Sequence, residues 1–356
     1  MPRSSAAKTA AMCAAAAAVA VAVACTAPAQ QPAGTSGTTA RPTSTGTSAR
    51  PAPKASPKPT PTPAPTPVAV GAAGTYEVGG RQLTFVAPAH TGPTGRSLGP
   101  RTLPAQIWYP RAQKSAGQWP ARGPFPLIVF APGFVQCVST YANLLKAWAG
   151  AGYVVAAVTF PRTNCGLGAA AYEPDLVNQP HDVAYVLTRV LALSARPGNP
   201  LSGLLNPREV AVAGQSDGGD TVAALAANTC CTDHRPKAVA VLSGAEWPPM
   251  PGRYFPGGEP PMLFVQGSAD TINPPWTSVQ LYTADKARTR YYLDLFGATH
   301  MEPYAGTNPV ERLVSRVTLA FFNRYVLGQA GAAAKMAHYG NVSGFAALVS
   351  GGQSPP

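Results

Sequence analysis

Short apolar runs separated by Pro and Gly recur along the chain from about residue 76 onward. Two alternating runs, 81–86 and 105–109, come first and fit antiparallel edge strands. The later runs are apolar almost throughout, which is typical of strands buried on both faces of a parallel sheet. They span residues 126–130, 153–160, 210–213, 238–242, 262–266 and 291–295.

Stretches of helical composition lie between these runs, at residues 141–149, 182–193, 219–228, 277–284 and 311–325. Alternation of strand and helix predicts one α/β domain with a mostly parallel central sheet and helices on both faces. The loops at the carboxyl ends of its strands would build the site. Because the stretches 162–179 and 247–260 are modest in length, no large lid is expected over that site.

The first residues resemble an export signal. Arg3 and Lys8 precede an apolar run at 9–24 that is too short to span a bilayer comfortably. The run ends in Ala-Val-Ala-Cys, which resembles the lipobox of bacterial lipoproteins, and Cys25 is then the expected site of lipidation. The alternative is cleavage after the small residues 27–29, which would give a freely secreted protein.

Composition divides the rest of the chain. After the signal segment 1–25, residues 26–73 form a Pro/Thr/Ala-rich stretch that cannot bury a core and is expected to be a disordered spacer. The folded α/β domain is expected at 74–328. Residues 329–356 read as an Ala/Gly-rich C-terminal tail.

The distribution of charged residues does not favour nucleic acid as a partner. Six of the 27 Lys and Arg residues precede Glu77, which leaves 21 against 15 acidic residues in the remainder. No basic run is interleaved with aromatic residues, so nucleic acid is not an expected partner. Membrane contact is expected only through the lipid on Cys25, and the domain is expected to be a monomer without metal or cofactor.

Four cysteines remain in the domain, and they permit three pairings. Cys137 and Cys165 each follow a predicted strand, as neighbours in one sheet would, and export favours disulfides. The sequence therefore predicts a Cys137–Cys165 bond. Cys230 and Cys231 would remain as a vicinal pair or as free thiols.

Ser216 lies in the pattern Gly-x-Ser-x-Gly, directly after the run 209–213 and before the helical stretch that starts at Gly219. A serine on a sharp strand-to-helix turn is the nucleophile of α/β hydrolases, and the glycines leave room for close neighbours. Ser97 satisfies the same pattern, but Pro100 follows it and no strand enters it. Ser97 is therefore interpreted as a loop residue.

Two backbone amides are candidates for an oxyanion hole. One is the amide of Asp217, at the start of the helix, and the other is the amide of Phe134, after the strand 126–130. Gly133 lets the chain turn so that the Phe134 amide faces the nucleophile. The Phe134 side chain is a candidate substrate contact, with ordinary core packing as the alternative.

A serine nucleophile needs a histidine base and a carboxylate that orients it. Only His300 follows the last predicted strand, whereas His90, His181, His234 and His338 lie elsewhere. The acid must fall between Ser216 and His300, and Asp270 does so on a loop after a strand. Glu246 is its main rival; Asp285 and Asp294 are weaker candidates.

These landmarks resemble actinobacterial α/β hydrolases related to cutinase-like polyester hydrolases, dienelactone hydrolases and the platelet-activating-factor acetylhydrolase group. The resemblance covers residues 74–328 and rests on the segments 131–134, 214–219, 267–274 and 297–300. It implies a substrate platform at Trp247, with Trp276 second. The chain departs from the relatives at Gln215 and Asp217; Asp217 would disfavour anionic acyl groups, or it is a solvated surface residue.

The motifs together predict an exported or surface-tethered serine hydrolase that cleaves carboxylic esters through an acyl-enzyme. Hydrolysis of amide, thioester or peptide bonds would use the same residues, because the reaction class depends on the pocket. A catalytically silent binding module of the same fold is a further alternative.

Overall fold

The computed structural model describes residues 70–111 and 120–355. The predictions for Cys25, the signal segment and most of the spacer concern residues outside these ranges. The strands are β1 (Glu77–Ala87), β2 (His90–Thr91), β3 (Ser97–Leu98), β4 (Arg101–Arg111), β5 (Phe125–Ala131), β6 (Val154–Val158), β7 (Leu205–Gln215), β8 (Val239–Leu242), β9 (Met262–Gly267), β10 (Arg290–Leu295) and β11 (Ala346–Ser350). The α-helices are α1 (Ala142–Gly150), α2 (Gln179–Ser194), α3 (Asp217–Ala227), α4 (Pro275–Ala284), α5 (Pro309–Tyr325) and α6 (Ala332–Gly340), and the 3-10 helices are η1 (Val138–Tyr141), η2 (Cys165–Ala170) and η3 (Glu173–Asn178).

Nine strands form one sheet in the order β1-β4-β6-β5-β7-β8-β9-β10-β11. The strands from β6 to β10 pair in parallel, whereas β1 and β4 at one edge and β11 at the other pair antiparallel. The chain runs from β5 to β6 on one side and then crosses to β7 on the other side of β5. Such a switch in direction leaves a crevice at the carboxyl ends of the strands, where ligands of α/β proteins bind.

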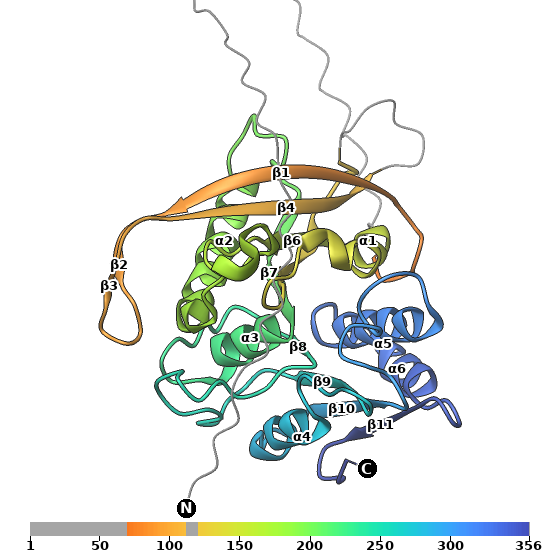
Figure 1. Ribbon diagram of the computed structural model, residues 1–356. Helices are drawn as coiled ribbons and strands as arrows, with labels where there is room; N and C mark the ends of the chain where they lie inside the picture. Colours follow the sequence, from red (N-terminus) through yellow and green to blue (C-terminus); the bar gives the residue numbers. More distant parts are fainter. Residues whose placement is uncertain (1–69, 112–119, 356) are drawn as a thin grey trace, which may run out of the picture. The chain divides into compact units, whose positions relative to one another are not determined.

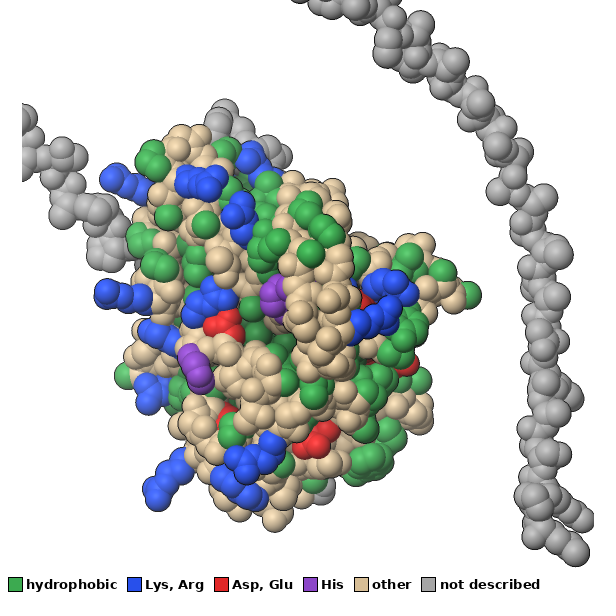
Figure 2. All heavy atoms as spheres, turned by 90° about the vertical axis from the view of Figure 1, so that its left-hand side faces the viewer, with side chains coloured by type: hydrophobic (Ala, Val, Ile, Leu, Met, Phe, Trp, Pro, Cys, Tyr) green, Lys and Arg blue, Asp and Glu red, His purple; other side chains and the backbone are tan. Residues whose placement is uncertain are grey.

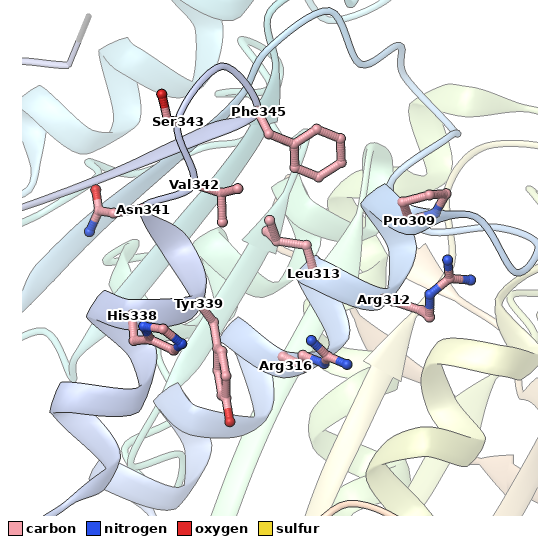
Figure 3. Close-up of a pocket in the computed structure, with 10 residues that line it drawn as sticks. All are labelled: Pro309, Arg312, Leu313, Arg316, His338, Tyr339, Asn341, Val342, Ser343 and Phe345. Carbon is pink, nitrogen blue, oxygen red and sulfur yellow. The ribbon is translucent and has the colours of Figure 1, made fainter.

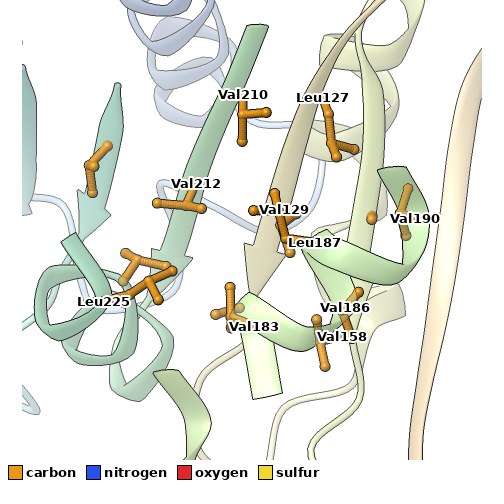
Figure 4. Close-up of a cluster of buried hydrophobic side chains, with 14 of the residues drawn as sticks. Leu127, Val129, Val158, Val183, Val186, Leu187, Val190, Val210, Val212 and Leu225 are labelled. Atoms are coloured by element: carbon orange, nitrogen blue, oxygen red, sulfur yellow. The ribbon is translucent and has the colours of Figure 1, made fainter. Parts of the chain in front are cut away.

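The apolar strands are buried on both faces because their neighbouring residues point into two different cores. Leu127 and Val129 pack with α2, α3 and α4, while Ile128 and Phe130 pack with α1, α5 and α6. Figure 1 shows these two sets of helices on opposite faces of the sheet. Figure 4 shows part of the first core, with Val183 and Leu187 of α2 against β5 and β7. The predicted α/β-hydrolase fold is confirmed.

The C-terminal boundary expected at residue 328 is wrong. Residues 332–340 form α6, and β11 pairs with β10 in the register Tyr291↔Ser350 to Leu295↔Ala346. The segment contains a nine-residue helix and a five-residue edge strand. The sequence did not predict them, because elements this short in an Ala/Gly-rich stretch give no clear hydrophobic period. Within the described residues, no helix combines the length and apolarity needed to cross a bilayer.

Disulfides join all four cysteines of the described residues. Cys137, after β5, is bonded to Cys165, which begins η2 after β6, and this is the pair expected from the sequence. Cys230 and Cys231 form a vicinal disulfide after α3, one of the two outcomes left open above. The first bond therefore ties together two loops at the carboxyl edge of the sheet.

A buried arginine joins β4 to the segments before and within α2. Arg101 donates through Nη2 to Asp175 Oδ2 at 2.7 Å and to Asp182 Oδ2 at 2.6 Å. All three residues are buried, and burial raises the pKa of Asp182 to about 6 although the Arg101 hydrogen bonds oppose that shift. One cation thus compensates two carboxylates that have little access to water.

The substitution Arg101→Met is expected to lower the free energy of unfolding by about 3–5 kcal/mol, because Asp175 and Asp182 would remain as buried acids without a cation. Urea unfolding at pH 8, followed by tryptophan fluorescence, measures the loss. The matched control is Arg111→Met, whose partner Glu77 is much more exposed, and its cost should stay below about 1 kcal/mol.

A triple variant separates charge from packing. When Arg101→Met is combined with Asp175→Asn and Asp182→Asn, most of the lost stability should return, because no buried charge remains to be compensated. A triple variant as unstable as the single one would show that the packing of the long arginine side chain is what matters.

Candidate active site

Ser216 occupies the turn between β7 and α3 in a conformation that non-glycine residues rarely adopt. Its φ and ψ are 56° and −125°, and its own amide donates to the Leu242 carbonyl at 2.9 Å. The Ser216 carbonyl in turn accepts from the Asp220 amide at 3.0 Å, which begins the helix. These bonds hold the strained turn, as expected of a nucleophile that must project from the end of a strand.

Glycine is required on both sides of this turn. A Cβ on Gly214 would lie 1.9 Å from the Gly218 carbonyl oxygen, and a Cβ on Gly218 would lie 1.9 Å from the Ala131 carbonyl oxygen. A Cβ on Gly133, after β5, would come within 3.1 Å of the Ser216 Cβ. The turn, the first residues of α3 and the loop after β5 therefore pack backbone against backbone.

His300 and Asp270 meet at the same edge of the sheet. Asp270 follows β9 and His300 follows β10, and His300 Nδ1 lies 2.7 Å from Asp270 Oδ2. The other oxygen of Asp270 accepts from the amides of Ile272 and Asn273 at 2.9 and 3.0 Å. Burial disfavours the Asp270 charge, but the hydrogen bonds from His300 and the amides outweigh it and hold the Asp270 pKa below its ordinary value.

The second nitrogen of His300 faces the side chain of Gln215. Gln215 Nε2 lies 3.2 Å from His300 Nε2, and Gln215 Oε1 accepts from the Tyr141 hydroxyl at 2.7 Å. An amide NH₂ group only donates, so His300 Nε2 is the acceptor and the ring proton is on Nδ1, toward Asp270. This is the tautomer that a general base needs. Among the described residues, no hydrogen bond joins Ser216 Oγ to His300.

The structure places both candidate oxyanion amides beside Ser216. Asp217 is the first residue of α3, where an amide has no acceptor within the helix. Phe134 follows Gly133 in the loop that touches the Ser216 turn, and its amide makes no hydrogen bond within the described residues. The Phe134 side chain is partly exposed and lies outside the hydrophobic clusters formed by those residues, so core packing does not account for it.

Residues 104–331, more than half of the chain, match the model of the PET hydrolase-like family. The chain belongs to this family. The expected likeness to cutinase-like esterases is thereby confirmed, and the protein is an esterase-like hydrolase. No curated protein matches the sequence.

One similar solved structure is the ferulic acid esterase from Streptomyces cinnamoneus. It superimposes with a TM-score of 0.54 at 21% identity, covering 71% of this chain and 91% of that chain. At this identity the likeness establishes the fold, which agrees with the family match.

Asp217 is not the solvated surface residue considered as an alternative. Its side chain is buried, and its Oδ2 has no hydrogen-bond partner among the described residues. Burial, together with the charge of Glu173, raises the pKa of Asp217 to about 7. The carboxyl next to Ser216 in this PET hydrolase-like chain is therefore partly protonated near neutral pH.

The two tryptophans differ in a way that the sequence does not show. Trp247, ranked first as a substrate platform, packs in a small cluster with Leu176 and Met250. Trp276, on the first turn of α4 after the Asp270 loop, is 64% exposed, and Ile272 on the same loop is 67% exposed. The more accessible aromatic ring at this edge is thus Trp276.

The other candidates lie apart from this arrangement. Ser97 is exposed in the β2–β3 hairpin, and His90 stacks on His181 with ring centroids 3.8 Å apart. Glu246 is partly buried, and the carboxylate bound to His300 is that of Asp270. Gln215 and Tyr141 were not predicted as site residues, since nothing in the sequence pairs a helix-start tyrosine with a residue 74 positions later.

A separate cavity of about 580 Å³ lies between α5, α6 and the segment before β11. Figure 3 shows Leu313, Val342 and Phe345 converging there, with Arg316 beside Tyr339. None of the predicted site residues lines it. The described residues also contain no group of His, Cys, Asp and Glu side chains that could hold a metal ion.

The raised pKa of Asp217 predicts a pH-dependent loss of stability. A group whose pKa is raised by folding stabilises the fold while protonated, and that contribution disappears as the pH rises through its folded pKa. Wild type should therefore lose roughly 2–4 kcal/mol from this group between about pH 4 and pH 8, and Asp217→Asn should not. Urea unfolding of both proteins across that range measures the difference.

Asp233→Asn is a control whose effect on the pH dependence of stability should have the opposite sign. Burial opposes the Asp233 charge, but its bonds to Arg235 lower its pKa, so this variant should lose stability at high pH. Parallel stability curves for wild type and Asp217→Asn would contradict the raised pKa of Asp217.

Proposed function

We propose that this chain is a serine hydrolase that cleaves carboxylic esters through an acyl-enzyme, with Ser216 as nucleophile, His300 as base and Asp270 as the residue that orients the base. The observation that carries the proposal is the His300–Asp270 hydrogen bond, formed at the strand ends that also carry the strained Ser216 turn. It leaves His300 Nε2 as an acceptor. Membership in the PET hydrolase-like family supports it.

In the first half-reaction, Ser216 Oγ attacks the ester carbonyl and His300 Nε2 takes the hydroxyl proton. The carbonyl oxygen becomes an oxyanion, which the amides of Phe134 and Asp217 would stabilise. Collapse of this intermediate breaks the ester bond, and His300 returns its proton to the leaving alcohol. Water activated by His300 then attacks the acyl group and releases the acid and Ser216.

Gln215 must give up its contact with His300 during this cycle. Its amide and the Ser216 hydroxyl would donate to the same nitrogen, and one lone pair cannot serve both. Catalytic hydrogen bonds are often loose in free enzymes and tighten when substrate binds. Substrate binding is therefore expected to turn His300 Nε2 from Gln215 to Ser216.

Neutral esters with an apolar acyl part are the first substrates to test. Phe134 after β5, and Ile272 and Trp276 after β9, supply apolar surface at the strand ends that include the Ser216 turn, and Trp276 and Ile272 are the most exposed of them. Polyesters are suggested by the family name, and feruloyl esters by the name of the similar esterase. Amide, thioester and peptide bonds are the alternatives within the same chemistry.

We also propose that the protein acts outside the cytoplasm, held at the cell surface by a lipid on Cys25. The Cys137–Cys165 disulfide supports export, since such bonds persist in oxidising compartments. Fatty-acid labelling that is unchanged in Cys25→Ser would contradict the tether.

Turnover of a p-nitrophenyl ester tests the assigned roles. Ser216→Ala and His300→Ala should each lower kcat by at least about 10³-fold, and Asp270→Asn should do so through loss of the correct tautomer. A fluorophosphonate should label Ser216 in the wild type. Glu246→Gln is the matched control, expected to stay within about threefold of wild type.

Three results would count against this proposal. Full activity of Ser216→Ala would overturn the mechanism, and a loss confined to the Glu246 variant would reassign the acid. Wild-type protein that turns over no ester of any acyl length, and that is not labelled, would point to a silent binding module.

A further inference from the structure

A groove of about 870 Å³ lies among the loops that follow β6 and β8 and the residues that lead into β4. One wall is the β2–β3 hairpin with the residues that lead into β4, at 94–102. The other wall consists of Pro161 and Arg162 after β6, Pro249 after β8, and five residues in and beside η3, which are Tyr172, Pro174, Asp175, Val177 and Asn178. Because β6 and β8 flank β5 and β7 and run parallel to them, these loops lie at the sheet edge that carries Ser216.

Two exposed arginines line the groove. Arg96 and Arg162 line it and are exposed, and neither forms an ion pair within the described residues. The acid in its lining, Asp175, is already paired with buried Arg101. The neighbouring Glu173 acts electrostatically on Asp217. Figure 2 shows many more Lys and Arg than Asp and Glu side chains on the face that carries the hairpin.

One aromatic ring is fixed at the same wall. Tyr172 is 45% exposed, and the Arg162 guanidinium lies 5.1 Å from its ring centroid. The Tyr172 amide donates to the Arg162 carbonyl at 2.7 Å, so the two residues are held together. Thr94, Ser97 and Thr102 add hydroxyl groups to a lining that also contains Leu98, Val177 and four prolines. The groove thus offers guanidinium donors, hydroxyls and one ring alongside apolar surface.

We propose that this groove binds an acidic oligosaccharide, a chain of carboxylate-bearing sugars, and that it positions the ester of such a chain at Ser216. Arginine forks bind carboxylates in pairs of hydrogen bonds, hydroxyls bind sugar hydroxyls, and a tyrosine face packs on a sugar ring. A small aromatic acid would meet only one ring and fill a fraction of the volume. The positioning role rests on the proposed function, whereas binding does not.

Binding is measured on the Ser216→Ala protein, so that its outcome does not depend on hydrolysis. Isothermal titration with a galacturonic acid hexamer should show binding that weakens with salt. The double variant Arg96→Glu/Arg162→Glu should bind at least about tenfold more weakly, a loss of about 1.4 kcal/mol. Arg196→Glu/Arg208→Glu is the matched control, because it makes the same charge change at exposed sites outside the groove and should bind as the parent does.

Several outcomes would overturn the groove assignment. The first is that the galacturonic acid hexamer does not bind, and the second is that a neutral xylose hexamer binds equally well. The third is that the control pair weakens binding as much as Arg96→Glu/Arg162→Glu does. The fourth is that polyphosphate and single-stranded DNA bind as tightly as the hexamer through the same arginines. With active protein, the double variant should lower kcat/KM for an ester carried on the acidic hexamer relative to a small neutral ester. Arginine-dependent binding without any esterase activity would preserve the groove and reject the proposed chemistry.

Discussion

The close approach of three backbone segments around Ser216 is the constraint on which the proposed site depends. Gly214, Gly218 and Gly133 each face a neighbouring atom that a Cβ would strike, so the turn, the start of α3 and the loop after β5 can pack this closely only because these residues are glycine. The same packing that forces Ser216 to φ 56° also brings the amides of Phe134 and Asp217 to its side. Strain at the turn is therefore maintained by the parallel strands β5 and β7, which are buried on both faces.

The surroundings of two carboxyl groups near this turn shift their pKa values in opposite directions. Asp270 is buried but accepts hydrogen bonds from His300, two amides and Gln266, so its charged form is favoured. Asp217 is buried with an unpartnered oxygen near Glu173, so its neutral form is favoured. In the proposed mechanism, separation of this kind would allow one acid to orient a base at neutral pH while the other carries only part of a negative charge beside the oxyanion. It also weakens the argument that Asp217 repels anionic acyl groups.

The sequence predicted the features that depend on strongly periodic or chemically constrained segments. Strands buried on both faces leave continuous apolar runs, and Ser216, Asp270 and His300 each follow a strand of one parallel sheet, which places them at its carboxyl edge. It could not predict β11, because a five-residue edge strand after a nine-residue helix carries little pattern. Nor could it predict that Gln215 contacts His300 or that Trp247 packs against Leu176 and Met250. Both contacts depend on how loops that are distant in the sequence pack against each other.

The two flanks of the carboxyl edge differ in chemistry, and this difference bears on the shape of the substrate. Toward β9, the Asp270 loop and α4 expose Ile272 and Trp276, which are apolar. Toward β6, the groove carries Arg96, Arg162 and Tyr172. Ser216, at the end of β7, lies between these strands in the sheet order. An ester with its apolar acyl part toward α4 and its polar, acidic alcohol part toward the hairpin would satisfy both flanks, whereas a uniformly apolar polymer would leave the arginines without partners.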